Sequence, residues 1–301
     1  MRQLATGRLG ERLTAVGSPT YPGFILEGGK KNLMVEAGLS LMGPLFLRGI
    51  EETLGSRDRL DFLFLTHSHY DHLGAARFLK ESIPGLTLGA HERVASLLLR
   101  ESALALMNSL SAVQLPLFPD VRDYGSVAIG PTEIGLTLRE GDELDLGGLT
   151  CRVFEVPGHT RDSLAFFIPG EGILFTGEAA GVPEGPDSNA PQVCFLSSYD
   201  EYLASLEKIL SLAPKVLCLG HGWVFTGGDA SQFLASSLAA TPAYRALIEH
   251  YLDEAHGDAG LATETMARCE YDERGAIRQE RTAYLTNLEA QVKLVAGLQG
   301  K

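Results

Sequence analysis

Four side chains that can bind metal ions fall within six residues of the chain, namely His67, His69, Asp71 and His72. They follow the apolar run Phe62-Leu63-Phe64-Leu65, which is typical of a strand buried on both faces. The end of such a strand is where α/β sheets usually place their chemistry. Because His67 and His69 are two residues apart, extended backbone projects both from one face. Asp71 and His72 come after the chain turns, and adjacent residues there diverge enough to serve two different ions, so the pattern suits a pair of metals that share one water.

A polar loop in which histidines cluster by chance is the alternative to a metal site. The chain has only 8 His in 301 residues, and three of them lie in this stretch with an Asp, which argues against chance. The pattern His-x-His-x-Asp-His is similar to the signature of the metallo-β-lactamase superfamily. The resemblance implies a four-layer αββα sandwich, and the chain's order of strands, helices, strands and helices suggests the same α/β arrangement.

Two further histidines stand at predicted strand ends beside glycines, in Pro157-Gly158-His159 and in Gly220-His221-Gly222. A lone histidine in such a place is more often structural. Here both match the order and spacing of the superfamily, so the resemblance makes them ligands. It implies that one ion is held by His67, His69 and His159, and the second by Asp71, His72 and His221.

Two acidic residues are expected to complete the site. Glu178 stands where the superfamily has an Asp that bridges both ions, and its extra methylene departs from that pattern. Glu178 can bridge both ions from a receded loop, or it can bind one ion only, and the sequence leaves both open. Glu36 ends a predicted strand, where the resemblance implies an acidic group that supports the metal-binding loop. A solvated strand end is the alternative for Glu36.

The predicted ligands indicate hydrolysis. Two divalent ions lower the pKa of a shared water, so that a metal-bridging hydroxide exists near neutral pH, and they stabilise the oxyanion of the substrate. Asp71 is predicted to orient the hydroxide and accept its proton. All seven ligands are nitrogen or oxygen donors, which favours two zinc ions and also suits iron or manganese.

Within the superfamily, the chain most resembles the quinolone-signal-response type of thioesterase. The resemblance rests on residues 66–72, on Glu101-Ser102-Ala103, and on Tyr202-Leu203-x-Ser205-Leu206-Glu207 before residues 220–222. It implies hydrolysis of an acyl thioester or ester, as in an acyl-CoA thioesterase. A glyoxalase II-like or lactonase-like hydrolase, and a regulatory binding protein that retains the metallohydrolase fold, are the alternatives.

The composition of the chain limits the kinds of partner and the cellular location that we expect. Net charge is −13, which argues against broad contact with nucleic acid or an anionic membrane. We therefore expect a small-molecule ester or thioester substrate, no nucleic acid and no membrane, and we keep a homodimer as an expectation. The 4 Cys are far apart in the sequence, and the N-terminus has no apolar core of a signal peptide, so we expect a cytoplasmic protein.

Residues 1–228 are predicted to form the catalytic core, and residues 229–301 a C-terminal helical cap packed on it. A helical insert is expected at about 91–114, either as a layer packed on the sheet or as a lid or subunit interface. Periodicity predicts strands at 13–17, 23–27, 32–36 and 86–90, five strands between 133 and 176, a strand at 216–219, and helices at 42–56, 74–82 and 200–212. Three helices are predicted in the cap, near 229–239, 242–255 and 278–298.

Overall fold

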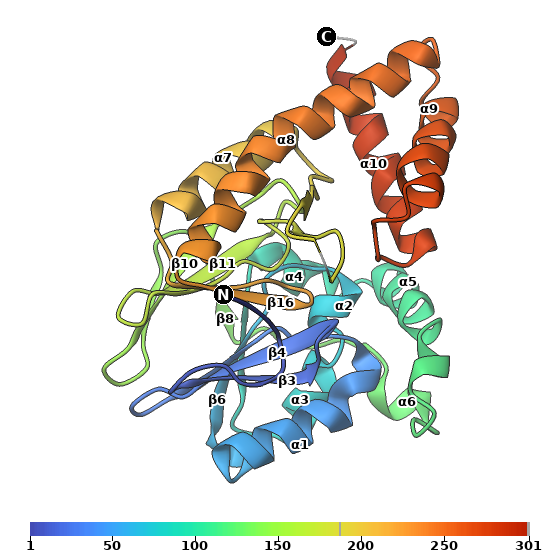
Figure 1. The fold of residues 1–301 in the computed structure, drawn as a ribbon. Helices are drawn as coiled ribbons and strands as arrows, with labels where there is room; N and C mark the ends of the chain where they lie inside the picture. The colour runs from blue at the N-terminus through green and yellow to red at the C-terminus, as the bar shows by residue number, and fades with distance from the viewer. Residues whose placement is uncertain (187, 300–301) are drawn as a thin grey trace. The chain divides into compact units, whose positions relative to one another are not determined.

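The structure is a computed structural model, and it describes residues 1–186 and 188–299 (Figure 1). The chain divides into two compact units. The first unit comprises residues 1–155, 162–177 and 215–226, and the second comprises residues 156–161, 178–214 and 227–301. The second unit therefore takes in two segments that precede the predicted boundary at residue 228. The packing of the C-terminal helices on the core as a cap stays a prediction.

The first sheet of the first unit has seven strands in sequence order from β2 to β8. β2 to β5 pair antiparallel, whereas β5, β6, β7 and β8 pair parallel. The parallel pairs bring the carboxyl ends of β5 and β6 to the same edge, where Glu36 follows β5 and residues 65–72, the candidate metal-binding loop, follow β6. The strands are β2 (Gly7–Arg8), β3 (Leu13–Ser18), β4 (Tyr21–Leu26), β5 (Asn32–Val35), β6 (Leu60–Phe64), β7 (Thr87–Ala90) and β8 (Leu136–Thr137).

The second sheet also has seven strands, in the order β1-β16-β15-β12-β11-β10-β9. β12 and β15 pair parallel, so the chain leaves both at one edge, toward Gly177 and Gly220. The sequence did not predict β1 and β16, which pair with each other and close that side of the sheet. The strands are β1 (Arg2–Leu4), β9 (Glu143–Asp145), β10 (Thr150–Glu155), β11 (Leu164–Ile168), β12 (Ile173–Phe175), β15 (Val216–Cys218) and β16 (Trp223–Thr226).

The two sheets stack through an aromatic core. Phe24 of the first sheet lies 5.6 Å from Phe175 of the second, and Phe64 lies 5.2 Å from Phe166, measured between ring centroids. Such pairs contribute about 0.5–1.5 kcal/mol each beyond the burial of their area. The outer face of the first sheet is covered by α1 (Gly43–Leu54) and α3 (Ala76–Ser82), which bury apolar side chains against it. Helix, sheet and sheet thus follow the predicted layer order.

The predicted insert forms several short helices in place of one long one. They are α4 (Glu92–Leu97), α5 (Glu101–Ala112), the 3-10 turn Leu115–Leu117 and α6 (Tyr124–Val127). α5 buries Leu104 and Met107 in the core cluster of the first unit and contacts α2 (Tyr70–Leu73), the helix of the metal-binding loop. The Oγ atoms of Ser111 and Ser40 lie 2.7 Å apart in the same buried layer. The inner face of the insert is therefore packed on the first unit.

The second unit is mainly helical and carries a two-stranded ribbon, β13 (Val182–Pro183) with β14 (Pro191–Gln192). Its helices are α7 (Tyr199–Ser211), α8 (Gly228–Glu254), α9 (Ala259–Met266), a π-helical turn (Ala267–Glu273) and α10 (Arg281–Gln299). None of the helices in the described part of the chain combines the length and the apolarity that crossing a membrane requires.

α8 is one continuous helix where the sequence predicted two. The predicted break lay just before Pro242, because proline lacks the N–H of an intrahelical bond. The hydroxyl of Thr241 donates to the carbonyl of Ser237 at 2.7 Å, and Phe233 and Ile248 are buried on either side of the proline. Tertiary packing therefore outweighs the local cost of one proline.

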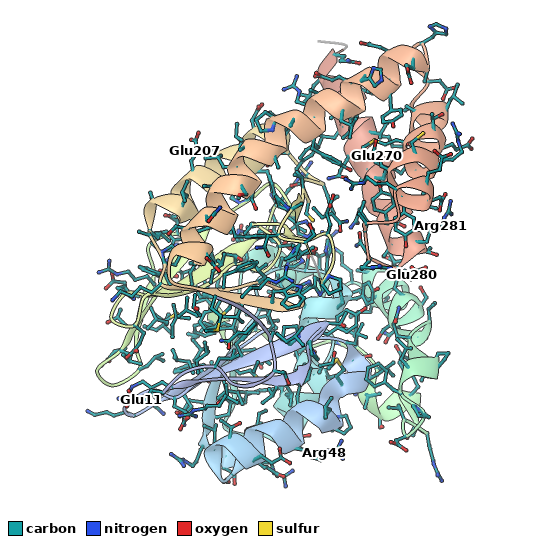
Figure 2. The ribbon with its side chains drawn as sticks, in the orientation of Figure 1. Glu11, Arg48, Glu207, Glu270, Glu280 and Arg281 are labelled. Atoms are coloured by element: carbon teal, nitrogen blue, oxygen red, sulfur yellow. The ribbon has the colours of Figure 1, made fainter. Side chains whose placement is uncertain are left out.

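α10 begins at Arg281, and the residue before it, Glu280, caps the helix with its carboxylate (Figure 2). The Glu280 carboxylate accepts hydrogen bonds from the backbone N–H groups of Thr282 (2.9 Å) and Ala283 (3.0 Å). The bond from Thr282, followed by that from Ala283, holds the pKa of Glu280 below its ordinary value. Arg281 makes two hydrogen bonds to Asp272 of the preceding turn and lowers the pKa of that carboxyl. Charge thus stabilises this end of α10.

Candidate metal centre

The metal-binding loop leaves β6 and enters α2 within a few residues. His69 is the N-cap of α2, in extended conformation, and the rings of His67 and His69 lie 4.7 Å apart between centroids. Asp71 and His72 occupy the first turn of α2, after the chain has turned as expected. The loop is pinned by the backbone, because the carbonyl of His72 accepts from the N–H of Ala37 at 2.8 Å.

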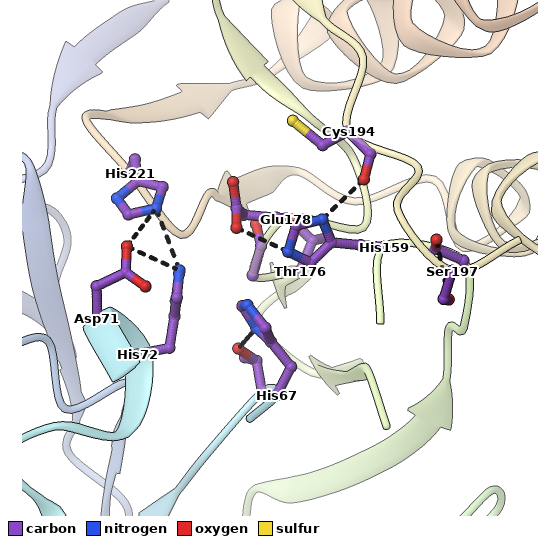
Figure 3. A network of polar contacts seen from close by, with 12 residues as sticks. His67, Asp71, His72, His159, Thr176, Glu178, Cys194, Ser197 and His221 are labelled. Atoms are coloured by element: carbon purple, nitrogen blue, oxygen red, sulfur yellow. Dashed lines mark hydrogen bonds and ion pairs between the residues drawn. The ribbon is translucent and has the colours of Figure 1, made fainter. Parts of the chain in front are cut away.

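Asp71, His72 and His221 converge in the first unit (Figure 3). One ligand atom from each lies within 4.8 Å of the others. The Nε2 atoms of His72 and His221 are 3.1 Å apart, and Asp71 Oδ2 is 3.6 Å from His221 Nε2. Gly220 permits this approach, because a Cβ there would lie 2.7 Å from His72 Cε1. His72 is buried, whereas Asp71 and His221 are partly exposed, as an accessible site requires.

Glu36 contacts the metal-binding loop at two points. Its Oε1 accepts from the Thr66 hydroxyl at 2.7 Å and lies 3.1 Å from His72 Nδ1. The side chain is 2% exposed, and its backbone has φ of 71°, a left-handed conformation that is costly for a residue other than glycine. A backbone strained in this way holds the buried carboxylate between Thr66 and His72.

The hydrogen-bond network assigns the same tautomer to three histidines of the first unit. Thr66 has one hydroxyl proton and donates it to Glu36, so its oxygen accepts from His67 Nδ1–H, 3.0 Å away. His72 Nδ1 faces the Glu36 carboxylate, and His221 Nδ1 lies 2.6 Å from the carbonyl of Thr20. Since carboxylates and carbonyls only accept, Nδ1 carries the proton in each ring. Nε2 is then the nitrogen whose lone pair could bind a metal ion.

His159 and Glu178 belong to the second unit and lie against each other (Figure 3). His159 Nε2 is 2.8 Å from Glu178 Oε2, and His159 Nδ1 is 2.7 Å from the carbonyl of Cys194. Both side chains are buried. The same rule places the proton on Nδ1, and so His159 also presents Nε2 to its neighbour.

The loop that carries His159 is fixed by one carbonyl. Gly158 accepts backbone hydrogen bonds from Leu196, Ser197 and Ser198, directly before α7. Gly158 has φ of 127°, and a Cβ there would lie 2.3 Å from the backbone of Tyr202. Only glycine therefore allows α7 and this loop to approach so closely.

These contacts bring acceptors together and fit a bound cation. In the first unit two Nε2 atoms face each other at 3.1 Å, and in the second an Nε2 faces a carboxylate oxygen at 2.8 Å. Acceptors at such distances repel unless a proton or a metal ion lies between them. The donor set of imidazole and carboxylate suits zinc, iron or manganese.

Sequence reasoning missed the role of Cys194, which acts through its backbone carbonyl. Any residue has such a carbonyl, so no signal in the sequence could have identified it. Burial, and then the negative charge of Glu178, raise the pKa of the Cys194 thiol. The thiol therefore stays protonated near neutral pH. Burial also raises the pKa of Cys151, to about 12.

Residues 22–221 match the model of the metallo-beta-lactamase superfamily. The chain belongs to that superfamily. The structure is similar to the metallo-beta-lactamase family protein TTHA1429 from Thermus thermophilus, with a TM-score of 0.63 and 21% identity, over 99% of this chain and 94% of that one. The predicted metallo-β-lactamase fold, with a C-terminal helical segment, is thereby confirmed.

Curated relatives are named for hydrolysis or for the fold. The metallo-beta-lactamase fold-containing protein ST1585 of Sulfurisphaera tokodaii is 28% identical over 66% of this chain and 71% of that protein. The acyl-coenzyme A thioesterase MBLAC2 of Gallus gallus is 26% identical over 64% of this chain and 68% of that protein. A hydroxyacylglutathione hydrolase of Fuscovulum blasticum is 37% identical, but the match spans only 37% of this chain and 39% of that protein.

Proposed function

We propose that this superfamily member is a metal-dependent hydrolase that holds two divalent ions and cleaves a thioester or ester bond. The observation that carries the proposal is the approach of His72 and His221, whose Nε2 atoms lie 3.1 Å apart beside Asp71. A cation shared by these three residues accounts for that approach. Zinc is the preferred metal, and iron or manganese suits the same donors.

For the other ion we propose His67, His69, His159 and Glu178. Gly177 belongs to the first unit, and a Cβ there would lie 2.7 Å from Thr66 Oγ1 and 3.4 Å from His67 Nδ1. Glu178 follows Gly177 directly in the sequence. The contact of Glu178 with His159 then supports the fourth ligand. Glu178 binds this ion alone or bridges both ions, and the Glu178→Asp variant distinguishes the two cases.

Two ions held there would supply hydroxide near neutral pH and polarise the oxygen of the substrate carbonyl. The residues of the chain do the rest. Asp71 stands beside two histidines with a partly exposed carboxylate, so it can orient the attacking water and accept its proton. Glu36 and the carbonyls of Thr20 and Cys194 hold the ligand rings in one orientation, so that the site is organised before substrate arrives.

An acyl thioester is the substrate class that we propose. It is supported by the relatives named as acyl-coenzyme A thioesterases, at 24–26% identity, and by those named as hydroxyacylglutathione hydrolases. The second candidate, a glyoxalase II-like hydrolase, is favoured by the higher local identity of 37%. We further propose a cytoplasmic location and no action on nucleic acid, in keeping with the net charge of −13.

A substrate panel tests the proposal. Metal-loaded protein is assayed on acyl-CoA esters of several chain lengths, on hydroxyacylglutathione, on a simple lactone and on single-stranded RNA. We expect turnover of acyl-CoA, loss of turnover and of bound metal in His69→Ala, and little RNA cleavage. His250→Ala, a change to an exposed histidine on α8, is the matched control and should leave both unchanged. Full activity in metal-free protein would refute a metallohydrolase, and faster turnover of hydroxyacylglutathione would favour the second candidate.

A further inference from the structure

The outward side of the insert carries a row of apolar side chains. Eight large apolar side chains are exposed in residues 1–186 and 188–299, and five of them lie between residues 99 and 117. They are Leu99 (70% exposed), Leu106 (60%), Leu110 (42%), Val113 (71%) and Leu117 (67%). With the partly exposed Ala103 they form what we call the outer row. Ala103, Leu106, Leu110 and Val113 lie on α5 and its C-cap and recur at steps of three, four and three residues, the spacing of a helix that packs along another helix. Leu99 precedes α5, and Leu117 lies in the 3-10 turn that follows it.

The outer row is distinct from the face that already packs on the first unit. α5 turns Leu104, Met107 and Ser111 inward, where they are buried. Asn108 also faces inward, because its amide donates to the carbonyl of Ile129 at 2.7 Å. α5 is therefore apolar on two sides, and of these only the inner side is packed in the core cluster of the first unit. An apolar helix face of this kind marks an interaction site.

The absence of charge around the outer row indicates which partner would cover it. Residues 102–119 contain no charged side chain, in a chain that is 21% charged and carries a net charge of −13. Two copies of so acidic a protein repel each other, and this surface lets them meet without bringing like charges together. Helices that bind membrane surfaces carry Lys and Arg on their polar face, and this stretch has none. A second copy of this chain fits better than a membrane.

The spacing of the outer row is self-complementary. On α5 and its C-cap, the steps of three, four and three residues from Ala103 to Val113 read the same in both directions, with residue 108 at the centre. When two such helices run antiparallel about a twofold axis, Leu106 of one copy faces Leu110 of the other, on both sides of the axis. A twofold interface requires this property, because the same surface must match itself.

We propose that α5 is a homodimer interface, in which two copies of the chain pair antiparallel through the outer row. α5 spans 12 residues, or roughly 18 Å. The area that a pair of these helices buries is therefore near the lower end of the range for specific interfaces. We therefore expect a reversible dimer with a dissociation constant on the order of micromolar. The proposal does not depend on the proposed function.

Sedimentation equilibrium over a range of concentrations tests the proposal. The unaltered chain should dimerise, and Leu106→Glu or Leu110→Lys alone should weaken dimerisation roughly 30-fold or more, because each buries a charge against leucine. Leu261→Glu changes an exposed leucine on α9 and is the matched control, which should dimerise like the parent. Val113→Glu, at the most exposed position of the row, replaces Leu106→Glu if that variant folds poorly.

Mixing the two variants tests the antiparallel arrangement. In the mixed dimer, Glu at 106 of one copy faces Lys at 110 of the other, while Leu110 faces Leu106 on the opposite side of the axis. Native mass spectrometry of the mixture should therefore detect the heterodimer. The proposal would be overturned if the parent chain stays monomeric in solution. It would also be overturned if the parent chain binds neutral phosphatidylcholine vesicles as a monomer. A dimer that both single variants retain, or a mixture that yields no heterodimer, would overturn it as well.

Discussion

Replacing Glu36 with Gln should weaken metal binding while leaving the fold intact. The change keeps the size of the side chain and removes the negative charge that faces Thr66 and His72. A hydrogen bond to a charged group contributes about 1.5–3 kcal/mol and a neutral one about 0.5–1.5 kcal/mol, so two bonds lose about 2 kcal/mol in total. The two bonds are formed without the ion, so affinity falls only by the part of that loss that arises when a cation at Nε2 makes His72 Nδ1–H a stronger donor. We expect roughly 10-fold for the ion at His72, the lower end of the range of about 10- to 100-fold for residues that orient ligands.

The assay is metal titration against a chelator of known affinity, followed together with the thermal unfolding of metal-free protein. Glu27→Gln is the matched control, because Glu27 is an acidic residue of the same unit that pairs with Arg8 away from the loop. We expect Glu36→Gln to lose affinity and Glu27→Gln to keep it. An affinity that stays within about twofold of the parent, with both metal-free proteins equally stable, would refute the reasoning.

Three further outcomes are expected. Asp71→Asn removes the proton acceptor and should lower kcat by about 10²-fold or more, measured with both ions bound; near-normal kcat would assign the proton to another group. Glu178→Asp draws the carboxylate back from its 2.8 Å contact with His159, so metal titration should show one ion binding more weakly and hydrolysis falling with it; tighter binding would mean that the loop has not receded to fit Glu. Glu280→Gln should destabilise α10 by about 0.5–1 kcal/mol at neutral pH. Since the folded pKa of Glu280 lies below the ordinary 4.5, this contribution is present above pH 4.5 and fades as the pH falls through the folded pKa. Unfolding curves at pH 7 and pH 4 should therefore differ less between variant and parent at the lower pH, and an equal difference at both would contradict the charge argument.

The sequence predicted those features that depend on residue type and period. Apolar runs located most strands of both sheets, and the resemblance to the superfamily implied that Asp71, His72 and His221 form one group, as they do in the structure. Other features depend on groups that every residue has. The carbonyls of Cys194 and Thr20 orient ligand rings, and no residue type announces a carbonyl in the right place.

Tertiary structure overrides local signals at the remaining positions. The left-handed backbone of Glu36 is set by the strand and loop around it, since glutamate does not favour that conformation. The sequence predicts separate helices near 229–239 and 242–255, yet burial on both sides of Pro242 carries α8 through as one helix. The strand β1 is three residues long and is stabilised by a partner more than two hundred residues away, so no local window could reveal it.

The hydrogen bond between Thr20 and His221 joins residues that are 201 positions apart. During synthesis, Asp71 and His72 leave the ribosome long before His221. The contact between Thr20 and His221 can form only after β15 has been made. A partly made chain therefore offers two of the three ligands of this cluster, and it can hold an ion there only weakly. Because closing so long a loop is slow, we expect the second ion to be acquired in the last step of folding. Its uptake then reports that the turn between β3 and β4 has met the loop between β15 and β16.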